Sequence, residues 1–267
     1  VYKNLNNRKL VILDCSWHLP SKKRNALKDY QYSHIKKSLF FDIDKIADKK
    51  TNLPHMAPNP IFFEKRMQQL GVNINSIIIV YDTIGIFSSA RVWWLFKYFG
   101  HNKVFVMNGG LQKWKKEKKP TTKKIFKTKK GNFISKLNDC LKVNYKFVLK
   151  NINNKNYIIL DARNNKRFHG KIKEPRLGLR KGHIPKSKNL FWGCLISNQG
   201  TILPKNKIIN KLNHYKLNKK TIITSCGSGV TACILSLALL HSKNIQSKVY
   251  DGSWTEWGLN NKLPIEK

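Results

Sequence analysis

Acidic residues are scarce in this sequence: 14 Asp and Glu stand against 52 Lys and Arg, a formal net charge of +38. Such a field attracts polyanions, so a nucleic acid or an anionic membrane is one possible partner. Only eight of the basic residues are Arg, however, whereas readers of bases and phosphates depend on the bidentate guanidinium. Lys, Asn and Ile are abundant throughout, which favours AT-rich codon bias as the source of the charge. We therefore expect no main role in nucleic-acid binding, although the field can attract a small anion.

Cysteine is also sparse. The five cysteines (15, 140, 194, 226 and 233) are odd in number and form no Cys-x-x-Cys pair. This pattern argues against a disulfide framework and against a zinc site, and it favours a reducing compartment. The apolar run Leu10–Leu13 is too short for a signal peptide, and Thr231–Leu240 is about half of a membrane span. We predict a cytoplasmic protein that has no membrane partner.

The chain contains an internal repeat. Short apolar strands, a turn with His, a strand followed by a glycine turn, and a segment ending in Trp each occur twice. The paired landmarks are Asp14 and Asp161, His34 and His183, Asp82 and Cys226, and Trp114 and Trp257. Their offsets of 147, 149, 144 and 143 residues are nearly constant. The sequence therefore predicts two copies of one domain.

Each copy alternates apolar strands with helical patterns, which predicts an α/β fold with a mostly parallel sheet and helices on both faces. We predict an amino-terminal domain over 1–130 and a carboxy-terminal domain over 145–267, with the Lys/Thr-rich segment 115–130 leading into the linker. Ligands of such sheets bind beyond the carboxyl ends of the strands. Cys226 lies at such a strand end, and Asp82 holds the equivalent position in the first copy. Asp82 has no thiol and cannot replace a cysteine nucleophile, so the first copy is predicted to be catalytically silent.

The loop Cys226-Gly-Ser-Gly-Val-Thr-Ala232 follows the second of these strands. Glycines at 227 and 229 allow a backbone whose N–H groups turn inward, and the following helix adds its positive end. Both favour a thiolate at Cys226, hence a nucleophile. The alternative is a buried Cys that merely ends a strand. A Cys-x5-Arg phosphatase loop is excluded because Ala occupies position 232.

With this loop, the sequence resembles the 3-mercaptopyruvate sulfurtransferases, a group of the rhodanese superfamily with tandem domains. The resemblance covers nearly the whole chain and includes Asp14-Cys-Ser-Trp17, Phe40-Phe-Asp-Ile-Asp44 and Tyr250-Asp-Gly-Ser-Trp254. Thiosulfate sulfurtransferases of this fold typically carry Cys-Arg-Lys-Gly in the loop, so the uncharged Gly227-Ser228 pair favours mercaptopyruvate. One departure is Ile35-Lys-Lys37, where the family usually has Ile-Pro-Gly.

Two arginines follow the predicted strand that ends at Asp161. Planar guanidinium groups suit the carboxylate and keto oxygen of an α-keto acid, and the resemblance implies this role for Arg167 and Arg176. The alternative is that each arginine forms a structural ion pair with Asp161 or Glu174. Arg163 and Arg180 are interpreted as structural. The substrate-binding residues of the loop are predicted to be Gly227, Gly229, Val230 and Thr231.

The resemblance also implies a proton-handling triad in which Asp44 and His55 of the first copy join Ser228 of the loop. Such a chain of groups could activate the nucleophile or protonate the leaving enolate. A lone Asp or His on the surface is the alternative.

The predicted enzyme is thus a sulfurtransferase with a ping-pong reaction: Cys226 takes sulfur from 3-mercaptopyruvate as a persulfide, and a thiol such as thioredoxin, or cyanide, accepts it. No metal or organic cofactor is expected. Two alternatives remain open. One is a thiosulfate:cyanide sulfurtransferase. The other is a persulfide relay or binding protein for a partner that thiolates tRNA or a cofactor.

Overall fold

A computed structural model describes residues 1–267, and the chain divides into two compact units. Unit 1 comprises Val1–Lys49, Ala57–Asn138 and Asn198–Thr201, and unit 2 comprises Lys50–Met56, Asp139–Ser197 and Ile202–Lys267. Two short segments, Lys50–Met56 and Asn198–Thr201, therefore belong to a different unit from their sequence neighbours. The domain limits 1–130 and 145–267 stay a prediction.

Unit 1 is built around a parallel sheet with strand order β3-β1-β4-β5. Its strands are β1 (Leu10–Asp14), β3 (Ser38–Phe40), β4 (Ile77–Tyr81) and β5 (Val104–Val106). A separate antiparallel pair joins β2 (His34–Ile35) to β6 (Thr121–Thr122). The helices are α1 (Ala26–Tyr32), α2 (Pro60–Gln69), α3 (Ser88–Tyr98) and α4 (Gly110–Lys116), with short 3₁₀ turns at Tyr2–Asn4 and Pro20–Lys22.

Unit 2 repeats this plan. Its parallel sheet has the order β7-β11-β10-β8-β9, so β9, β8, β10 and β11 correspond to β3, β1, β4 and β5. The strands are β7 (Lys142–Val143), β8 (Tyr157–Asp161), β9 (Lys188–Asn189), β10 (Thr221–Ser225) and β11 (Lys248–Tyr250). The helices are α5 (Tyr145–Asn151), α6 (Asn165–Phe168), α7 (Lys205–Asn213), α8 (Ala232–Lys243) and α9 (Ser253–Leu259), with 3₁₀ turns at Asp139–Leu141 and Trp192–Leu195. The predicted duplication and fold class are confirmed.

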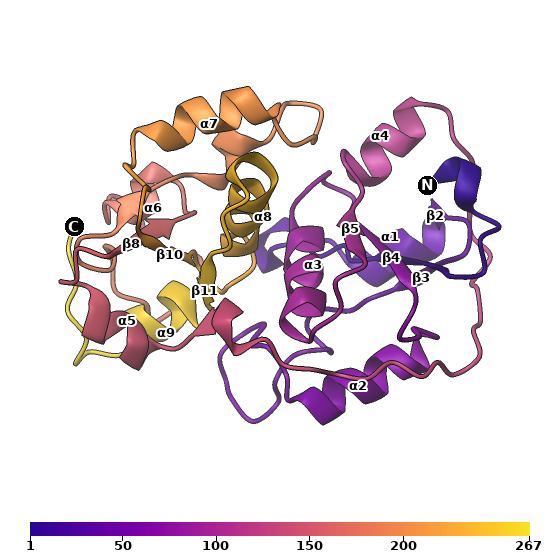
Figure 1. The fold of residues 1–267 in the computed structure, drawn as a ribbon, viewed down its shortest axis with the longest axis horizontal. Helices are drawn as coiled ribbons and strands as arrows, with labels where there is room; N and C mark the ends of the chain where they lie inside the picture. Colours follow the sequence, from indigo (N-terminus) through magenta and orange to yellow (C-terminus); the bar gives the residue numbers. More distant parts are fainter. The chain divides into compact units, whose positions relative to one another are not determined.

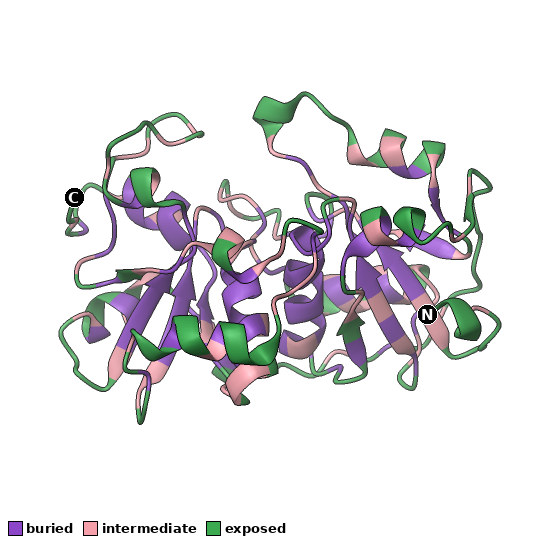
Figure 2. Ribbon diagram, turned by 90° about the horizontal axis from the view of Figure 1, so that it is seen from above, coloured by how far each residue is buried: buried purple, intermediate pink, exposed green.

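Helices cover both faces of the unit 2 sheet. Figure 1 shows α7 and α8 on one side of β8, β10 and β11, and α5 and α9 on the other. Strands buried on both faces are near-continuous apolar runs, as in Tyr157–Asp161. The core of this unit gathers aromatic and aliphatic side chains, among them Ile159, Ile223, Trp254 and Trp257. Figure 2 shows the sheet strands largely buried and the outer helices and loops largely exposed.

The two repeated histidines hold turns together. His34 Nδ1 lies 2.6 Å from the carbonyl oxygen of Tyr30, and His183 Nδ1 lies 3.0 Å from that of Phe168. The His183 ring also stacks on Phe168 at 3.8 Å between ring centroids. Both histidines therefore have structural contacts within their own unit. None of the helices is long and apolar enough to cross a membrane.

Candidate active site

Cys226 occupies the position predicted for it. It directly follows β10, and the loop from 226 to 231 leads into α8. The parallel ladder places it at the carboxyl edge of the sheet, beside the end of β8, where the amide of Ala162 donates to the carbonyl of Ser225 at 2.8 Å. This edge is where parallel α/β sheets bind ligands. The side chain is buried, with 2% of its surface exposed.

The start of α9 binds the first two carbonyls of the loop, those of Cys226 and Gly227. The amide of Trp254 donates to the carbonyl of Cys226 at 3.0 Å. The amide and the hydroxyl of Thr255 both donate to the carbonyl of Gly227, at 2.8 and 2.6 Å. Gly229 has φ +74°, a left-handed conformation that favours glycine. Hydrogen bonds to the carbonyls of Cys226 and Gly227 thus hold the loop against the start of α9.

Four amides of the loop, in contrast, have no protein acceptor. No hydrogen bond of the structure has the amide of Gly227, Ser228, Val230 or Thr231 as its donor. Helix α8 also begins without a side-chain cap. Buried backbone donors are almost always paired, so a group of unpaired amides at a helix start suits an anion. This matches the predicted binding role of the loop, which stays a prediction for each residue.

In unit 1 the equivalent turn carries a carboxylate, Asp82, at its first position. The carboxylate of Asp82 accepts hydrogen bonds of 2.8–2.9 Å from four backbone amides and one of 2.6 Å from a hydroxyl. The amide donors belong to Ile84, Gly85, Phe87 and Ser89, and the hydroxyl to Ser89. By the offset of 144 residues, Asp82 corresponds to Cys226. In unit 1 the N–H groups of the turn therefore point to the side chain at its first position.

Ser253 lies against the thiol and was missed in the sequence. Its hydroxyl oxygen accepts the amide of Cys226 at 3.1 Å and is 4.0 Å from the sulfur. The same hydroxyl donates to the carbonyl of Tyr250 at 2.8 Å. Ser253 has φ +50°, which is uncommon for a residue with a side chain. Its place in Tyr250-Asp-Gly-Ser-Trp254 was the only available signal, and that motif gave no distance to Cys226.

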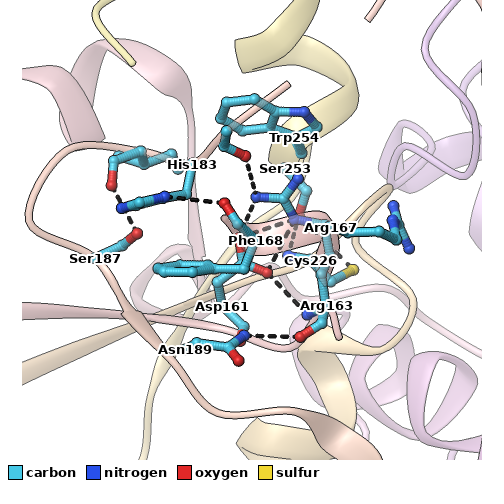
Figure 3. A network of polar contacts seen from close by, with 12 residues as sticks. Asp161, Arg163, Arg167, Phe168, His183, Ser187, Asn189, Cys226, Ser253 and Trp254 are labelled. Carbon is cyan, nitrogen blue, oxygen red and sulfur yellow. Dashed lines mark hydrogen bonds and ion pairs between the residues drawn. The ribbon is translucent and has the colours of Figure 1, made fainter. Parts of the chain in front are cut away.

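A chain of ion pairs leads from the sheet to the loop. The buried Arg163 pairs with Asp161 at 2.8 Å and with Glu174 at 2.9 Å, and Glu174 pairs with Arg167 at 2.5 Å. Burial disfavours the charge of Arg163, but both carboxylates outweigh burial and raise its pKa. Figure 3 shows the guanidinium of Arg167 on the same side of this network as the sulfur of Cys226. The interpretation of Arg163 as structural is confirmed.

Arg167 is both paired and close to the loop. A Cβ placed on Gly227 would lie 3.0 Å from Nη2 of Arg167, so a glycine lets the guanidinium approach the backbone. Arg180 donates to four backbone carbonyls, at Trp257, Gly258, Asn260 and Leu263, which confirms its structural interpretation. Arg176 is half-buried in the segment after Glu174. Substrate binding by Arg167 and Arg176 stays a prediction.

His55 reaches the loop from the segment Lys50–Met56 of unit 2. Its Nδ1 lies 3.0 Å from Oγ of Ser228, and both residues are buried. His55 has φ +63°, so the backbone is held in an uncommon conformation at this contact. Asp44 belongs to unit 1, where it accepts the indole N–H of Trp17 at 2.9 Å. The triad of Asp44, His55 and Ser228 stays a prediction.

The other cysteines have different surroundings. Cys15 and Cys233 are buried, and Cys140 and Cys194 are exposed. Burial, together with the nearby carboxylates of Asp14 and Asp82, raises the pKa of Cys15 well above its ordinary value. No group of three or more His, Cys, Asp or Glu could hold a metal ion.

Comparison with protein families matches two rhodanese-like domains, over residues 1–117 and 145–260. The chain therefore belongs to the rhodanese family. It is 38% identical to the mitochondrial thiosulfate/3-mercaptopyruvate sulfurtransferase 1 of Arabidopsis thaliana, over 100% of this chain and 76% of that protein. It is 35% identical to the 3-mercaptopyruvate sulfurtransferase of Escherichia coli K12, over 99% of this chain and 94% of that protein.

A solved structure supports the same family assignment. The crystal structure of SseA from Escherichia coli, described as a 3-mercaptopyruvate sulfotransferase with the rhodanese fold, superposes with a TM-score of 0.86 at 33% identity. The match covers 94% of this chain and 95% of that one. Within the rhodanese family, the chain is thus a member of the 3-mercaptopyruvate sulfurtransferase group, as its sequence motifs predicted.

Proposed function

We propose that this chain moves sulfane sulfur from 3-mercaptopyruvate to a thiol or to cyanide through a persulfide on Cys226, and that it releases pyruvate. The observation that carries the proposal is the set of four unpaired amides in the loop of Cys226. The equivalent turn of unit 1 supports it, because there the carboxylate of Asp82 accepts backbone amides at the corresponding position. The relatives named above support the choice of donor.

In the first step, the thiolate of Cys226 attacks the sulfur of the donor and forms an S–S bond. The C–S bond breaks, and its electron pair leaves on carbon as the enolate of pyruvate. The proton that was on the donor sulfur balances the step by moving to that carbon. The loop amides stabilise the negative charge on the terminal sulfur, as an oxyanion hole stabilises oxygen.

Arg167 and Arg176 would hold the carboxylate and keto oxygen of the donor. Glu174 takes part of the hydrogen-bonding capacity of Arg167, which orients the guanidinium beside Gly227. Ser228 and His55 would carry the proton to the enolate, because their side chains are within hydrogen-bond distance of each other. Asp44 would complete the triad. The unit 1 loop, with Asp82 in place of a thiol, would stay silent.

In the second step, an acceptor thiolate attacks the outer sulfur, and Cys226 leaves as a thiolate. The acceptor is proposed to be a small protein thiol of the thioredoxin kind. We propose the cytoplasm as the compartment, although one relative is named as mitochondrial. Fractionation of cells that express the tagged full-length protein tests this compartment.

The experiment is intact-mass measurement after addition of 3-mercaptopyruvate, with pyruvate release followed in parallel. We expect a gain of about 32 Da that maps to the peptide of Cys226. Cys226→Ser should show neither the gain nor turnover. Because Cys140 and Cys194 are exposed, the double variant Cys140→Ser/Cys194→Ser is the matched control and should retain both. Full turnover by Cys226→Ser would end the proposal.

Thiosulfate is the second candidate donor, because the Arabidopsis relative is named for both substrates. The ratio of kcat/KM for the two donors, measured with cyanide as the common acceptor, decides between them. A persulfide relay for a thiolating partner would instead show stable Cys226 persulfide, poor turnover on both donors and salt-sensitive retention of RNA.

A further inference from the structure

Unit 2 contains a second concave site, far from Cys226 along the strands. A cavity of about 660 Å³ opens beside the amino-terminal ends of β8 and β10, and we call it the lysine basin. Its lining residues are Asn151–Lys155, Tyr157–Ile159, Lys186, Lys188, His214–Lys216 and Lys220. Cavities that hold small ligands span about 300–1,000 Å³.

The basin and the thiol lie at opposite ends of the sheet. Tyr157 and Lys220 stand at or just before the first residues of β8 and β10, whereas Cys226 follows the last residue of β10. A strand rises about 3.3 Å per residue, so the five residues of β10 separate the two ends by about 16 Å. The basin therefore does not belong to the site of sulfur transfer.

The charged side chains that line the basin have one sign, although Glu266, outside the lining, accepts the amide of Lys186 at 3.0 Å. Five lysines and one histidine line it, and no Asp or Glu does. The Nζ of Lys186 donates to Oδ1 of Asn153 at 2.7 Å, a neutral partner. Lys155, Lys188, Lys216 and Lys220 make no ion pair in the structure. Elsewhere the few carboxylates do pair with lysines, as Glu117 does with Lys113 and Lys119.

Cations that repel one another around a concave surface lower the free energy of an anion placed between them. Lysine ammonium groups bind phosphate as point charges. Asparagine side chains and Tyr215 at the rim supply neutral polar groups, although the Tyr215 hydroxyl already donates to the carbonyl of Asn189 at 2.6 Å. Several cations around one open depression match several phosphates on one small molecule better than they match an extended strand.

We propose that the lysine basin binds a small anion with several linked phosphates, either a nucleoside triphosphate or inorganic polyphosphate. The site does not depend on the sulfur chemistry of Cys226.

The test is isothermal titration of the full chain with tripolyphosphate and, separately, with adenosine triphosphate at low and at physiological salt. The triple variant Lys155→Gln/Lys188→Gln/Lys220→Gln removes three basin charges. Its matched control, Lys146→Gln/Lys207→Gln/Lys262→Gln, removes three exposed charges of the same unit outside the basin.

We expect about tenfold weaker binding, or more, in the basin variant and less than about twofold weakening in the control. Cys226→Ser should bind as the wild type does. Tighter binding of adenosine triphosphate than of tripolyphosphate would assign a nucleotide, and equal binding would assign the phosphates alone. Equal losses in both triple variants would overturn the proposal, because they would reflect diffuse charge. Binding of an RNA oligonucleotide with neither small anion bound would also overturn it.

Discussion

The imidazole Nδ1 of His55 lies 3.0 Å from the hydroxyl oxygen of Ser228, a residue 173 positions further along the chain. The segment Lys50–Met56 carries this histidine into unit 2, and a left-handed backbone at His55 completes the approach. Holding a non-glycine residue in that conformation costs about 1–3 kcal/mol. The surrounding structure must therefore compensate for this cost, which is typical of a functional contact.

Removal of either partner should slow the chemical step. We expect Ser228→Ala and His55→Gln each to lower kcat for 3-mercaptopyruvate by about 10²-fold, since positioned proton transfer contributes about 10²–10⁴-fold. KM should change little, because neither group is proposed to bind the donor carboxylate. Single-turnover pyruvate release measures the step directly. If the double variant is no slower than either single variant, the two residues act as one unit, whereas unchanged kcat in both would contradict the role.

Glu174 links the structural arginine to the proposed substrate arginine. Glu174→Gln leaves Arg163 and Arg167 without a shared carboxylate, and breaking a buried pair costs about 3 kcal/mol. We expect a lower free energy of unfolding in urea together with a higher KM for 3-mercaptopyruvate, because Arg167 loses its orientation. Glu117→Gln, at an exposed pair, is the control and should change neither. A normal KM in folded Glu174→Gln would show that Arg167 is not oriented by Glu174.

The turn of unit 1 in which backbone amides bind the carboxylate of Asp82 can be tested by substitution. Asp82→Asn replaces one acceptor oxygen with an N–H₂ group that faces backbone donors. Hydrogen bonds to a charged group contribute about 1.5–3 kcal/mol each, so we expect unfolding to become easier by about 3 kcal/mol. Activity per folded molecule should stay within a factor of about two, because no catalytic atom is removed. Loss of turnover without loss of stability would instead give Asp82 a chemical role.

The sequence predicted the duplication, the parallel sheets and the strand-end position of Cys226 because each is a local pattern repeated at a constant offset. It also predicted the structural contacts of Arg163 and Arg180, whereas the binding roles of Arg167 and Arg176 stay predictions. It could not predict the contact of Ser253 with the thiol, since that contact depends on how the start of α9 meets the loop. Nor could it predict that Lys50–Met56 joins unit 2, because no local pattern marks where a segment packs.

The sequence also did not predict that several lysines adopt a left-handed backbone conformation. Six lysines have positive φ, at positions 23, 37, 118, 186, 216 and 219. Lys118 follows the end of α4, where its amide donates to the carbonyl of Lys115 and the amide of Lys119 donates to that of Trp114. This geometry is that of a helix end at which glycine is favoured. Lysine in these turns is consistent with composition bias acting against glycine.

Lys118→Gly should therefore stabilise unit 1, because glycine adopts φ +53° without a steric penalty. We expect a gain of about 0.5–1 kcal/mol in the free energy of unfolding, seen as a rise in Tm. Lys116→Gly, at the last residue of α4, is the matched control and should lose up to about 1 kcal/mol. A loss of stability in both variants would mean that the backbone at 118 is not strained.

His183 should make unit 2 sensitive to acid. Burial lowers the pKa of His183 below its ordinary value, more than the carbonyl of Phe168 and the carboxylates of Glu266 and Asp161 raise it. Below about pH 6.5 the unfolded chain binds a proton that the folded chain does not, so the free energy of unfolding falls as the pH falls. We expect urea midpoints measured from pH 7.5 to pH 5 to decline less steeply in His183→Gln than in the wild type. His101→Gln is the comparison in unit 1, because burial lowers the pKa of His101 as well. An identical slope in His183→Gln and the wild type would show that His183 takes up its proton equally in both states.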